Sequence, residues 1–298
     1  MESVAGSGHP EVGEPTLSVV IPVRNGAELL PVQLRALAAQ EFDHPWEVVV
    51  VDNGSTDGTA EVAASFRSAL PRLRIVSHER MGRANACNYG VSIARGHKIL
   101  FVDADDEVGP GYVELLARAL DQHPFVASRL DPHRLNPEWI VRSMPVSQEA
   151  GFGDPFGLYP TPGGGTIGVR REVFEELSGF DPSMRYCEDI DFGWRAWRAG
   201  FEPYFVGEAV VFVRHRTSFR GIFRQARGYG TSGPILFRRY RDIGMPRRSP
   251  RTMVRFWAAP IVRLLRIRAR ADLAAWVALI GFRAGLLQGC ASERVLYL

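Results

Sequence analysis

The sequence LSVVIPV at residues 17–23, followed by WEVVVVD at residues 46–52, decides the fold class. Both are short, largely β-branched apolar runs that end at polar turn residues, which is typical of strands buried on both faces of a sheet. Residues 27–40, between them, carry leucines at helical spacing and a proline near the start, so they predict a helix. A strand, a helix and a second buried strand predict a βαβ unit with parallel strands.

The same alternation continues along the chain. Further helix and strand patterns cover residues 59–70, 73–77, 83–94, 98–103, 111–122, 170–178, 188–199 and 204–213. Residues 131–165 are rich in Pro and Gly and lack periodicity, so we expect a functional loop there. We therefore predict an α/β fold, a Rossmann-like and mostly parallel sheet with flanking helices, whose ligands bind beyond the carboxyl ends of the strands.

The charge is distributed unevenly. Residues 1–210 carry 18 Lys and Arg against 30 Asp and Glu, whereas residues 211–298 carry 18 against 3, so the net charge of +3 hides an acidic body and a basic tail. A composition of 46% hydrophobic and 23% charged residues is that of a folded globular protein. We predict a disordered leader at residues 1–15, an α/β domain at residues 16–215 and a basic amphipathic helical extension at residues 216–298.

The cysteines and the apolar segments indicate the compartment. Cys87, Cys187 and Cys290 are far apart and lack metal-ligand spacing, which excludes a disulfide framework and a zinc site and favours a reducing compartment. The first 15 residues lack the pattern of a secretory signal. The apolar run at residues 273–289 is short for a spanning helix and contains Arg283. We therefore expect a cytoplasmic location.

Two acidic motifs point to chemistry. Asp103 and Asp105 directly follow a predicted buried strand, where alternate carboxylates can hold one divalent cation while phosphate oxygens and water complete its shell. The alternative is a solvated acidic turn. Glu188, Asp189 and Asp191 begin an amphipathic helix, where carboxylates also suit the helix dipole.

A set of motifs in a fixed order resembles the family 2 glycosyltransferases of the GT-A fold. The match extends over about residues 16–215, the whole predicted α/β domain. The resemblance implies a donor half at residues 16–107 and an acceptor half at residues 108–215. The matching segments are LSVVIPVRN at 17–25, VDNGSTD at 51–57, DAD at 103–105, GG at 164–165, VRRE at 169–172, GFD at 179–181 and ED at 188–189.

The resemblance implies inverting transfer from a nucleotide-diphosphate-sugar donor (a UDP-, GDP- or dTDP-sugar) with bound Mn²⁺ or Mg²⁺. Asp103 and Asp105 match the metal and diphosphate motif, with Ala104 between them also on the donor side. His215, after the last predicted strand, is a further candidate metal ligand, although a lone histidine is more often structural or exposed.

The donor's nucleoside is assigned to the first two strand ends. Pro22 and Asn25 match the first-strand loop, and Asp52 matches the nucleoside-contacting carboxylate, whose chemistry suits a base imide or ribose hydroxyls. Asn53 replaces a frequent second aspartate of the family, a change that bears on base or ribose preference.

The chain also departs from the family at Cys87, where an arginine is usual. Arg83 lies one helical turn earlier and is a candidate to compensate, or else a surface charge.

On the acceptor side, Asp189 matches the position assigned as general base, with Glu188 as its catalytic neighbour. Asp191, Gly164 and Gly165 are assigned to the acceptor side. A cation beside the departing diphosphate and a separate base for the acceptor hydroxyl are what glycosyl transfer requires.

The basic tail leaves several interpretations open. Arginines alternate with apolar residues at helical spacing over residues 253–270, and the apolar residues 273–287 follow, which together predict an amphipathic helical hairpin. We expect peripheral attachment to the anionic inner membrane face, or packing on the catalytic domain or a second subunit. No nucleic-acid module accompanies the arginines, so we do not expect a nucleic-acid partner.

Two other functions compete with glycosyl transfer. A sugar-nucleotide nucleotidyltransferase would want a Gly-rich basic loop after the first strand, and residues 22–26 (PVRNG) count against it. A non-catalytic nucleotide-sugar-binding scaffold is disfavoured by the intact acidic motifs. The acceptor, a glycan, a lipid-linked glycan or a small molecule, is not determined by the sequence.

Overall fold

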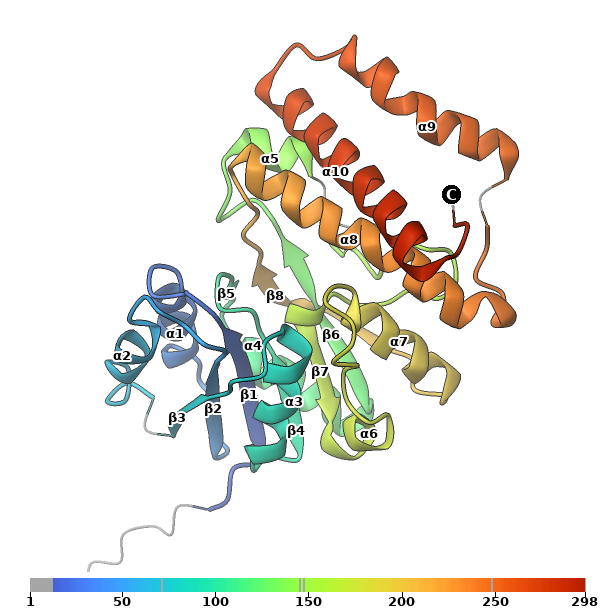
Figure 1. Ribbon diagram of the computed structural model, residues 1–298. Helices are drawn as coiled ribbons and strands as arrows, with labels where there is room; N and C mark the ends of the chain where they lie inside the picture. Colours follow the sequence, from blue (N-terminus) through green and yellow to red (C-terminus); the bar gives the residue numbers. More distant parts are fainter. Residues whose placement is uncertain (1–12, 71, 145, 147, 248, 298) are drawn as a thin grey trace, which may run out of the picture.

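The computed structural model describes residues 13–70, 72–144, 146, 148–247 and 249–297, so the predicted leader at residues 1–15 lies mostly outside the described residues. One sheet crosses the described part of the chain in the order β3-β2-β1-β4-β7-β6-β8-β5 (Figure 1). The strands are β1 (Leu17–Val23), β2 (Trp46–Asp52), β3 (Leu73–Ser77), β4 (Lys98–Phe101), β5 (Glu107–Val108), β6 (Phe125–Asp131), β7 (Ile167–Arg170) and β8 (Tyr204–Phe212).

The sheet is mixed but mostly parallel, which confirms the predicted α/β class. Strands β1 to β4 pair in parallel, and so do β6 and β8, whereas β7 runs antiparallel to both of its neighbours and β5 antiparallel to β8. The parallel pairing of β1, β2 and β4 brings the polar loops after these strands to one edge of the sheet.

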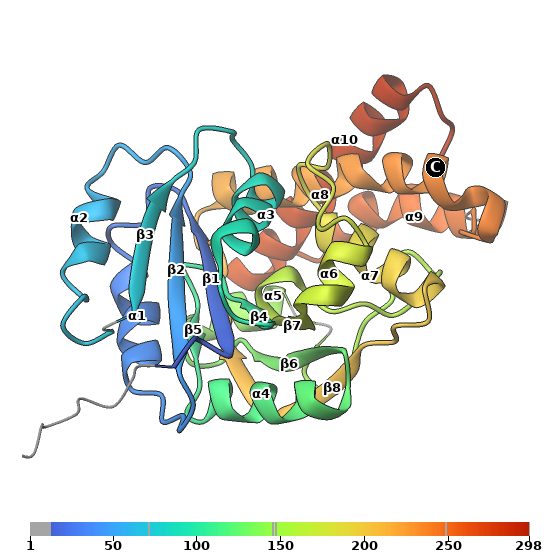
Figure 2. The ribbon, with the colours of Figure 1, turned by 90° about the horizontal axis from the view of Figure 1, so that it is seen from below.

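Helices cover both faces of the sheet, as Figure 2 shows from below. They are α1 (Leu30–Ala38), α2 (Thr59–Ala64), α3 (Arg83–Ile93), α4 (Tyr112–Gln122), α5 (Glu138–Ser143), α6 (Arg171–Glu176), α7 (Glu188–Arg198), α8 (Phe219–Tyr240), α9 (Pro250–Leu264) and α10 (Arg270–Glu293), with short 3₁₀ turns η1 (Gly164–Thr166) and η2 (Arg241–Ile243). Apolar residues of α1 and α4 pack on one face, and those of α3, α6 and α7 pack on the other. Alternate residues of β1 serve the two cores, with Val19 and Ile21 in one and Val20 in the other.

Some sequence expectations differ from the structure. The helix expected over residues 59–70 ends at Ala64, and the expected loop at residues 131–165 contains α5. Strands β6 and β7 were not expected. Strand β7 has four residues and contains Gly168, where an added Cβ would lie 2.8 Å from Val126 Cγ2 of β6, so a close strand contact, rather than a periodic apolar pattern, defines it.

The C-terminal helices form a unit built around a glycine contact. Helix α10 lies against α8 at Gly281, Gly285 and Gly289, and an added Cβ would come within 2.6 Å of the Phe223 carbonyl oxygen at Gly281 and of the Thr231 carbonyl oxygen at Gly289. Small residues at every fourth position let helix backbones approach closely. Since α8 and α10 meet in this way, the predicted helical extension is present and packs against its own chain.

Helix α10 also meets a length and composition test for membrane-spanning helices: an 18-residue window within Arg270–Glu293 has a mean hydropathy of 1.5. A third of that window (33%) is buried in the protein.

Candidate active site

A cleft of about 940 Å³ opens at the carboxyl ends of β1, β2 and β4. Its walls come from the loops after these strands, the start of α3, the segment before α7 and one residue before α8. The residues lining it are Pro22, Val23, Arg24, Asn25, Gly26, Leu29, Asn53, Met81, Gly82, Arg83, Ala84, Ala86, Asp103, Ala104, Asp105, Pro182, Ser183, Met184, Arg185, Tyr186 and Arg216.

One guanidinium connects the two acidic motifs. Arg83 Nε donates to Asp103 Oδ1 at 3.0 Å, and Arg83 Nη1 donates to Glu188 Oε1 at 3.3 Å. Burial acts to lower the pKa of Arg83, but Asp103 and Glu188 outweigh it and hold that pKa well above its usual value. Arg83 Nη2 is buried and has no hydrogen-bond partner among the described residues. A buried donor of this kind on an arginine at the cleft suits an anionic ligand oxygen.

Two glycines allow this arrangement. An added Cβ at Gly164 would lie 2.6 Å from Arg83 Nη1, and one at Gly165 would lie 2.6 Å from Asp103 Oδ2. Both glycines were assigned to the acceptor side from the sequence. The structure places their backbone directly against the guanidinium and the carboxylate of the predicted donor side.

The start of α7 carries the other carboxylates. Asp189 Oδ2 accepts from the Gly164 backbone N–H at 2.8 Å, and its Oδ1 accepts from the Ile190 N–H at 2.9 Å. Burial raises the pKa of Asp189, and Arg83 opposes the rise. The helix begins after Cys187, which adopts a left-handed conformation with φ of 60°. The Gly164 contact therefore fixes the orientation of the Asp189 carboxylate beside the Arg83 pair.

The neighbouring Glu188 also has a perturbed acidity. Its side chain is buried, and burial raises its pKa to about 7 although Arg83 acts in the other direction. Glu188 therefore changes its ionisation close to neutral pH.

Asp105 also lines the cleft and pairs with an arginine of its own. Arg216 Nη2 approaches Asp105 Oδ2 at 3.2 Å, and Arg214 Nε donates to the Asp105 carbonyl at 3.0 Å. Burial and the nearby Asp103 raise the pKa of Asp105, whereas Arg216 lowers it.

His215 lies between these arginines but is not among the residues lining the cleft. Its backbone N–H donates to Asn136 Oδ1 at 2.7 Å, and its Nε2 is buried without a partner among the described residues. Desolvation lowers the pKa of the imidazole, so the ring is held in its neutral form.

Asp103 and Asp105 are the candidate ligands for a divalent cation. Their carboxylates follow the same strand, β4, and both line the cleft. The described residues contain no cluster of three or more His, Cys, Asp or Glu side chains arranged to hold a metal. Hard cations of the Mg²⁺ type are commonly held by one or two carboxylates and complete their shell with phosphate oxygens and water, so two aspartates are sufficient.

The first-strand loop is held by the loop after β2. Asn25, at φ of 52°, accepts from the Thr56 N–H at 2.9 Å, and its own N–H donates to Ser55 Oγ at 2.9 Å. Asp52 is half-buried, accepts from the Ser55 N–H at 2.9 Å and is not among the residues lining the cleft.

Asn53, the departure from the family pattern, has a structural explanation. Its amide nitrogen donates to the His78 and Arg80 carbonyls at 2.9 and 2.8 Å, and its Oδ1 accepts from the Gly82 N–H at 2.8 Å. An aspartate has no N–H to donate to these carbonyls. Asn53 thus fastens the segment that leads into α3 and Arg83.

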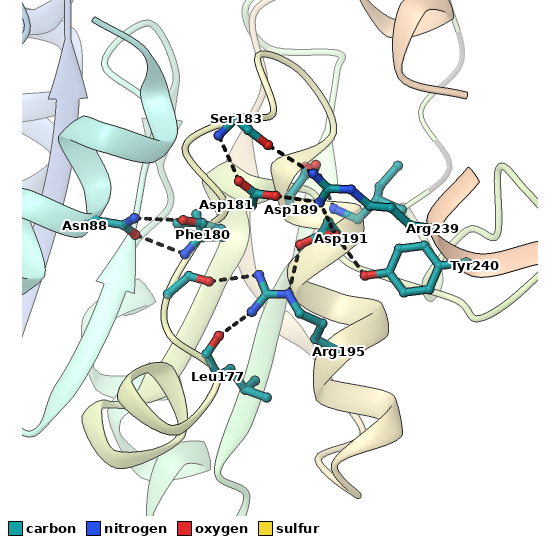
Figure 3. A network of polar contacts seen from close by, with 12 residues as sticks. Asn88, Leu177, Phe180, Asp181, Ser183, Asp189, Asp191, Arg195, Arg239 and Tyr240 are labelled. Carbon is teal, nitrogen blue, oxygen red and sulfur yellow. Dashed lines mark hydrogen bonds and ion pairs between the residues drawn. The ribbon is translucent and has the colours of Figure 1, made fainter. Parts of the chain in front are cut away.

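Asp191, predicted on the acceptor side, lies in an internal network instead of the cleft wall (Figure 3). The residue is 1% exposed. Its Oδ2 accepts from Arg195 Nε at 2.8 Å, while its Oδ1 accepts from the Tyr240 hydroxyl at 2.8 Å and from Arg239 Nη1 at 3.1 Å. These contacts link α7 to α8.

Two parts of the cleft were not predicted from the sequence. Neither Arg216 nor residues 182–186, including Tyr186, were predicted as site residues. The run Arg214-His215-Arg216 after the last strand was the available signal for Arg216, since a basic residue beside an acidic cleft suits an anionic substrate. The 182–186 segment carries no motif, and only the fold brings it to the cleft.

Comparison with known proteins identifies the family. The sequence profile described as "Glycosyl transferase family 2" matches residues 18–178, more than half of the chain. The chain belongs to glycosyl transferase family 2. Within this family 2 enzyme, the matched range includes Arg83, Asp103, Asp105 and both glycines of η1, whereas Asp189 and Arg216 lie beyond it.

Sequence relatives include bacterial glycosyltransferases. The uncharacterized glycosyltransferase YibD of Escherichia coli is 32% identical over 127 residues, which cover 42% of this chain and 35% of YibD. The putative glycosyltransferase EpsE of Bacillus subtilis is 27% identical over 210 residues, covering 67% of this chain and 73% of EpsE. The chain thus spans about a third of the length of YibD.

Solved structures share the fold over nearly the whole family 2 chain. The mannosyltransferase PcManGT from Pyrobaculum calidifontis, in complex with GDP-Man and Mn²⁺, has a TM-score of 0.63 and 19% identity, covering 94% of this chain and 90% of that one. TarS residues 1–349 from S. aureus, in complex with UDP-GlcNAc, has a TM-score of 0.53 and 18% identity, with coverage of 95% and 93%. At this identity the likeness concerns the fold.

Proposed function

We propose that this protein is an inverting glycosyltransferase that moves a sugar from a nucleotide-diphosphate-sugar to an acceptor hydroxyl. One observation carries the proposal: Arg83 connects Asp103, which follows the donor-side strand β4, to Glu188, which is next to Asp189 in the chain. Arg83 and Asp103 line the cleft, whereas Glu188 and Asp189 are not among its lining residues. The candidate base is therefore linked to the proposed diphosphate position through the Arg83 side chain. Family membership and the nucleotide-sugars bound by two structural neighbours support the same chemistry.

The donor side is assigned as follows. The diphosphate lies against Arg83, whose buried Nη2 supplies an N–H to a phosphate oxygen. Asp103 and Asp105 would hold Mn²⁺ or Mg²⁺, which would supply electrostatic stabilisation of the charge that grows on the departing diphosphate. Arg216, paired with Asp105, adds positive charge at the cleft. Pro22, Asn25 and Asp52 remain the predicted nucleoside contacts.

Asp189 is the proposed general base. Its carboxylate takes the proton of the acceptor hydroxyl while that oxygen forms a bond to the anomeric carbon, and the bond from this carbon to the diphosphate oxygen breaks. Two backbone N–H groups orient the carboxylate. Its pKa is raised by burial, which makes it a better proton acceptor than a solvent-exposed aspartate.

Donor and metal binding are tested together by isothermal titration with GDP and UDP, with and without Mn²⁺. Asp105→Ala is expected to abolish the Mn²⁺-dependent part of the affinity, because one of two metal carboxylates is lost. Asp121→Ala, which removes an exposed carboxylate on α4, is the matched control and should bind like the wild type. Unchanged metal-dependent affinity in Asp105→Ala would contradict the assignment.

The base is tested separately. Asp189→Asn keeps the shape of the side chain but cannot accept the proton, so transfer should fall by about 10²–10⁴-fold with nearly unchanged donor affinity. If Glu188→Gln is instead the variant that loses transfer while Asp189→Asn remains active, the base is Glu188.

A turnover assay with a nucleotide-sugar separates the competing functions. A nucleotidyltransferase would form a nucleotide-sugar from a nucleoside triphosphate and a sugar phosphate, and a non-catalytic scaffold would bind the donor without any turnover. Metal-dependent release of nucleoside diphosphate from a nucleotide-sugar, lost in Asp189→Asn, is expected only of the glycosyltransferase.

A further inference from the structure

Helix α9 presents large apolar side chains to solvent. The exposed fractions are 70% for Val254, 68% for Ile261 and 83% for Leu265. Leu265 is the C-cap residue of the helix. These three side chains are seven and four residues apart, which puts them on one helix face. Val262 and Leu264 beside them are 45% and 52% exposed. A cluster of exposed apolar side chains on one helix is characteristic of an interaction surface.

The opposite face of α9 is already occupied by α10. Trp276 Nε1 donates to the Pro260 carbonyl at 2.9 Å. Arg283 of α10 is only 5% exposed. Its Nε donates to the Phe256 carbonyl at 3.0 Å, and its guanidinium lies over the Phe256 ring. These contacts fix α9 on the protein, so its apolar outer face is directed outward by the fold, at the edge of the molecule in Figure 1.

The charge around this face is of one sign. Residues 243–271 contain eight arginines and no Asp or Glu. Arg251, Arg255, Arg263 and Arg266 are all exposed. A stripe of large apolar residues bordered by cations is the composition of helices that lie in the interface of an anionic membrane. A second copy of this chain would bring the same arginines against these, which is unfavourable.

We propose that the outer face of α9 binds the surface of an anionic lipid bilayer, with the helix lying in the interface plane. We assign lipid contact to α9 instead of α10 because the glycine face of α10 is covered by the α8 backbone. Helix α8 also carries Arg220, Arg224 and Arg227, which are unsuited to the hydrocarbon layer. Binding in this geometry is reversible and salt-sensitive.

The test is flotation of the full-length protein with vesicles of pure phosphatidylcholine and of phosphatidylcholine with 30% phosphatidylglycerol (about the anionic fraction that gives a strong surface field). The wild type should float with the anionic vesicles at low salt, float little with the neutral ones and be released at high salt. Arg251→Ala/Arg255→Ala should reduce the partition coefficient by roughly 30-fold, and Leu265→Glu should reduce it at least as strongly.

Matched controls change the same chemistry elsewhere. Arg118→Ala/Arg198→Ala removes two exposed arginines of the catalytic domain, and Tyr204→Glu places a charge at an exposed aromatic residue of β8. Both should bind as the wild type does, and circular dichroism should show that every variant is folded.

Three results would overturn the proposal. The first is equal flotation of Leu265→Glu and the wild type. The second is wild-type protein that ignores anionic vesicles but dissociates from dimer to monomer on Leu265→Glu in sedimentation experiments, which would assign the face to a second copy. The third is binding that resists both high salt and carbonate, which would indicate insertion across the bilayer.

Discussion

At the scale of single residues, the most informative position is Cys87. The family pattern has an arginine there, and the sequence offered Arg83 either as a substitute or as a surface charge. In the structure Cys87 is fully buried, and burial raises the pKa of its thiol to about 12, so it is an inert core residue. Arg83 is half-buried in the cleft wall and paired with both Asp103 and Glu188, so it is not a free surface charge.

Arg83→Ala is therefore expected to lower kcat by about 10²–10³-fold, the loss typical when one donor to a developing charge is removed. The charge that held Asp103 in place would be lost as well. Steady-state kinetics with a nucleotide-sugar donor measure the effect, and Arg83→Ala/Cys87→Arg tests whether an arginine at the family's position restores part of it. A kcat within threefold of the wild type for Arg83→Ala would contradict this role.

Glu188 gives a pH prediction. Its folded pKa, about 7, lies above its ordinary value of 4.5 because burial disfavours the charged form. Between these two values the folded state holds more protons than the unfolded state, so stability falls as pH rises through the window from about 4.5 to about 7. Glu188→Gln, which cannot ionise, should lack this loss.

Thermal unfolding of the wild type and of Glu188→Gln at pH 5 and pH 8 measures the difference. The melting temperature of the wild type should drop more between these pH values than that of the variant. Asp121→Asn, at an exposed carboxylate, serves as the control for general charge effects. Parallel pH profiles for the wild type and Glu188→Gln would show that Glu188 titrates normally.

The sequence predicts a site residue where a motif marks it, and misses a residue whose contacts depend on distant parts of the chain. Asp103, Asp105 and Asp189 were predicted because they match the family's metal motif and base position. Their places at a strand end and a helix start alone also suit an acidic turn or the helix dipole. Asn53 was noted only as a departure, since its bonds to the carbonyls of residues 78 and 80 depend on the path of a loop. Asp191 belonged to the same acidic run as Asp189, and only the position of Tyr240 separates their surroundings.

At the scale of elements, strands β1 and β2 have the predicted bounds because buried parallel strands are largely continuous apolar runs. The contact between α8 and α10 was not predicted, although glycines at positions 281, 285 and 289 are visible in the sequence. A glycine spacing acquires meaning only with its partner helix, and nothing local to α10 identifies α8 as that partner.

Gly285→Val tests this contact. An added Cβ at Gly285 would overlap the Arg227 carbonyl, a backbone atom that cannot move aside without shifting α8. The substitution should destabilise the protein by about 1–3 kcal/mol or more, as overpacking does. Ala291→Val, at an exposed position of the same helix, is the matched control. Urea unfolding midpoints measure the difference, and equal midpoints for the two variants would show that the helices are not held this closely.

At the scale of the whole molecule, the sequence left open whether the basic tail packs on protein or meets a membrane. In the structure, the helices of the tail differ in what covers their apolar faces. Helices α8 and α10 join an apolar cluster with the catalytic domain, in which Trp194 of α7 contacts Phe156 and Tyr240 edge-on. Helix α9 keeps an exposed apolar face. The sequence could not distinguish these helices, because helical periodicity predicts an apolar face but not whether protein or lipid covers it.

This packing predicts that the catalytic domain and the C-terminal helices unfold together. Asp191 is the link, because its two carboxylate oxygens bind Arg195 on its own helix and Arg239 and Tyr240 of α8 (Figure 3). Calorimetry of the wild type should therefore show a single transition.

Tyr240→Phe removes only the hydroxyl that donates to Asp191, so the ring packing against Trp194 is kept and a buried carboxylate oxygen loses one of its two partners. A loss of about 1–3 kcal/mol is expected from leaving such a group less satisfied, still within one transition. Tyr204→Phe, at a tyrosine 47% exposed, is the control and should unfold like the wild type. Hydrogen exchange completes the test: amides of α7 and of α8 should lose protection to the same extent in Tyr240→Phe, because each helix is held through the same carboxylate. If α8 alone becomes labile, or if the wild type already unfolds in two steps, the C-terminal helices are a separate unit that merely rests on the catalytic domain, and Asp191 belongs to the stability of α7 alone.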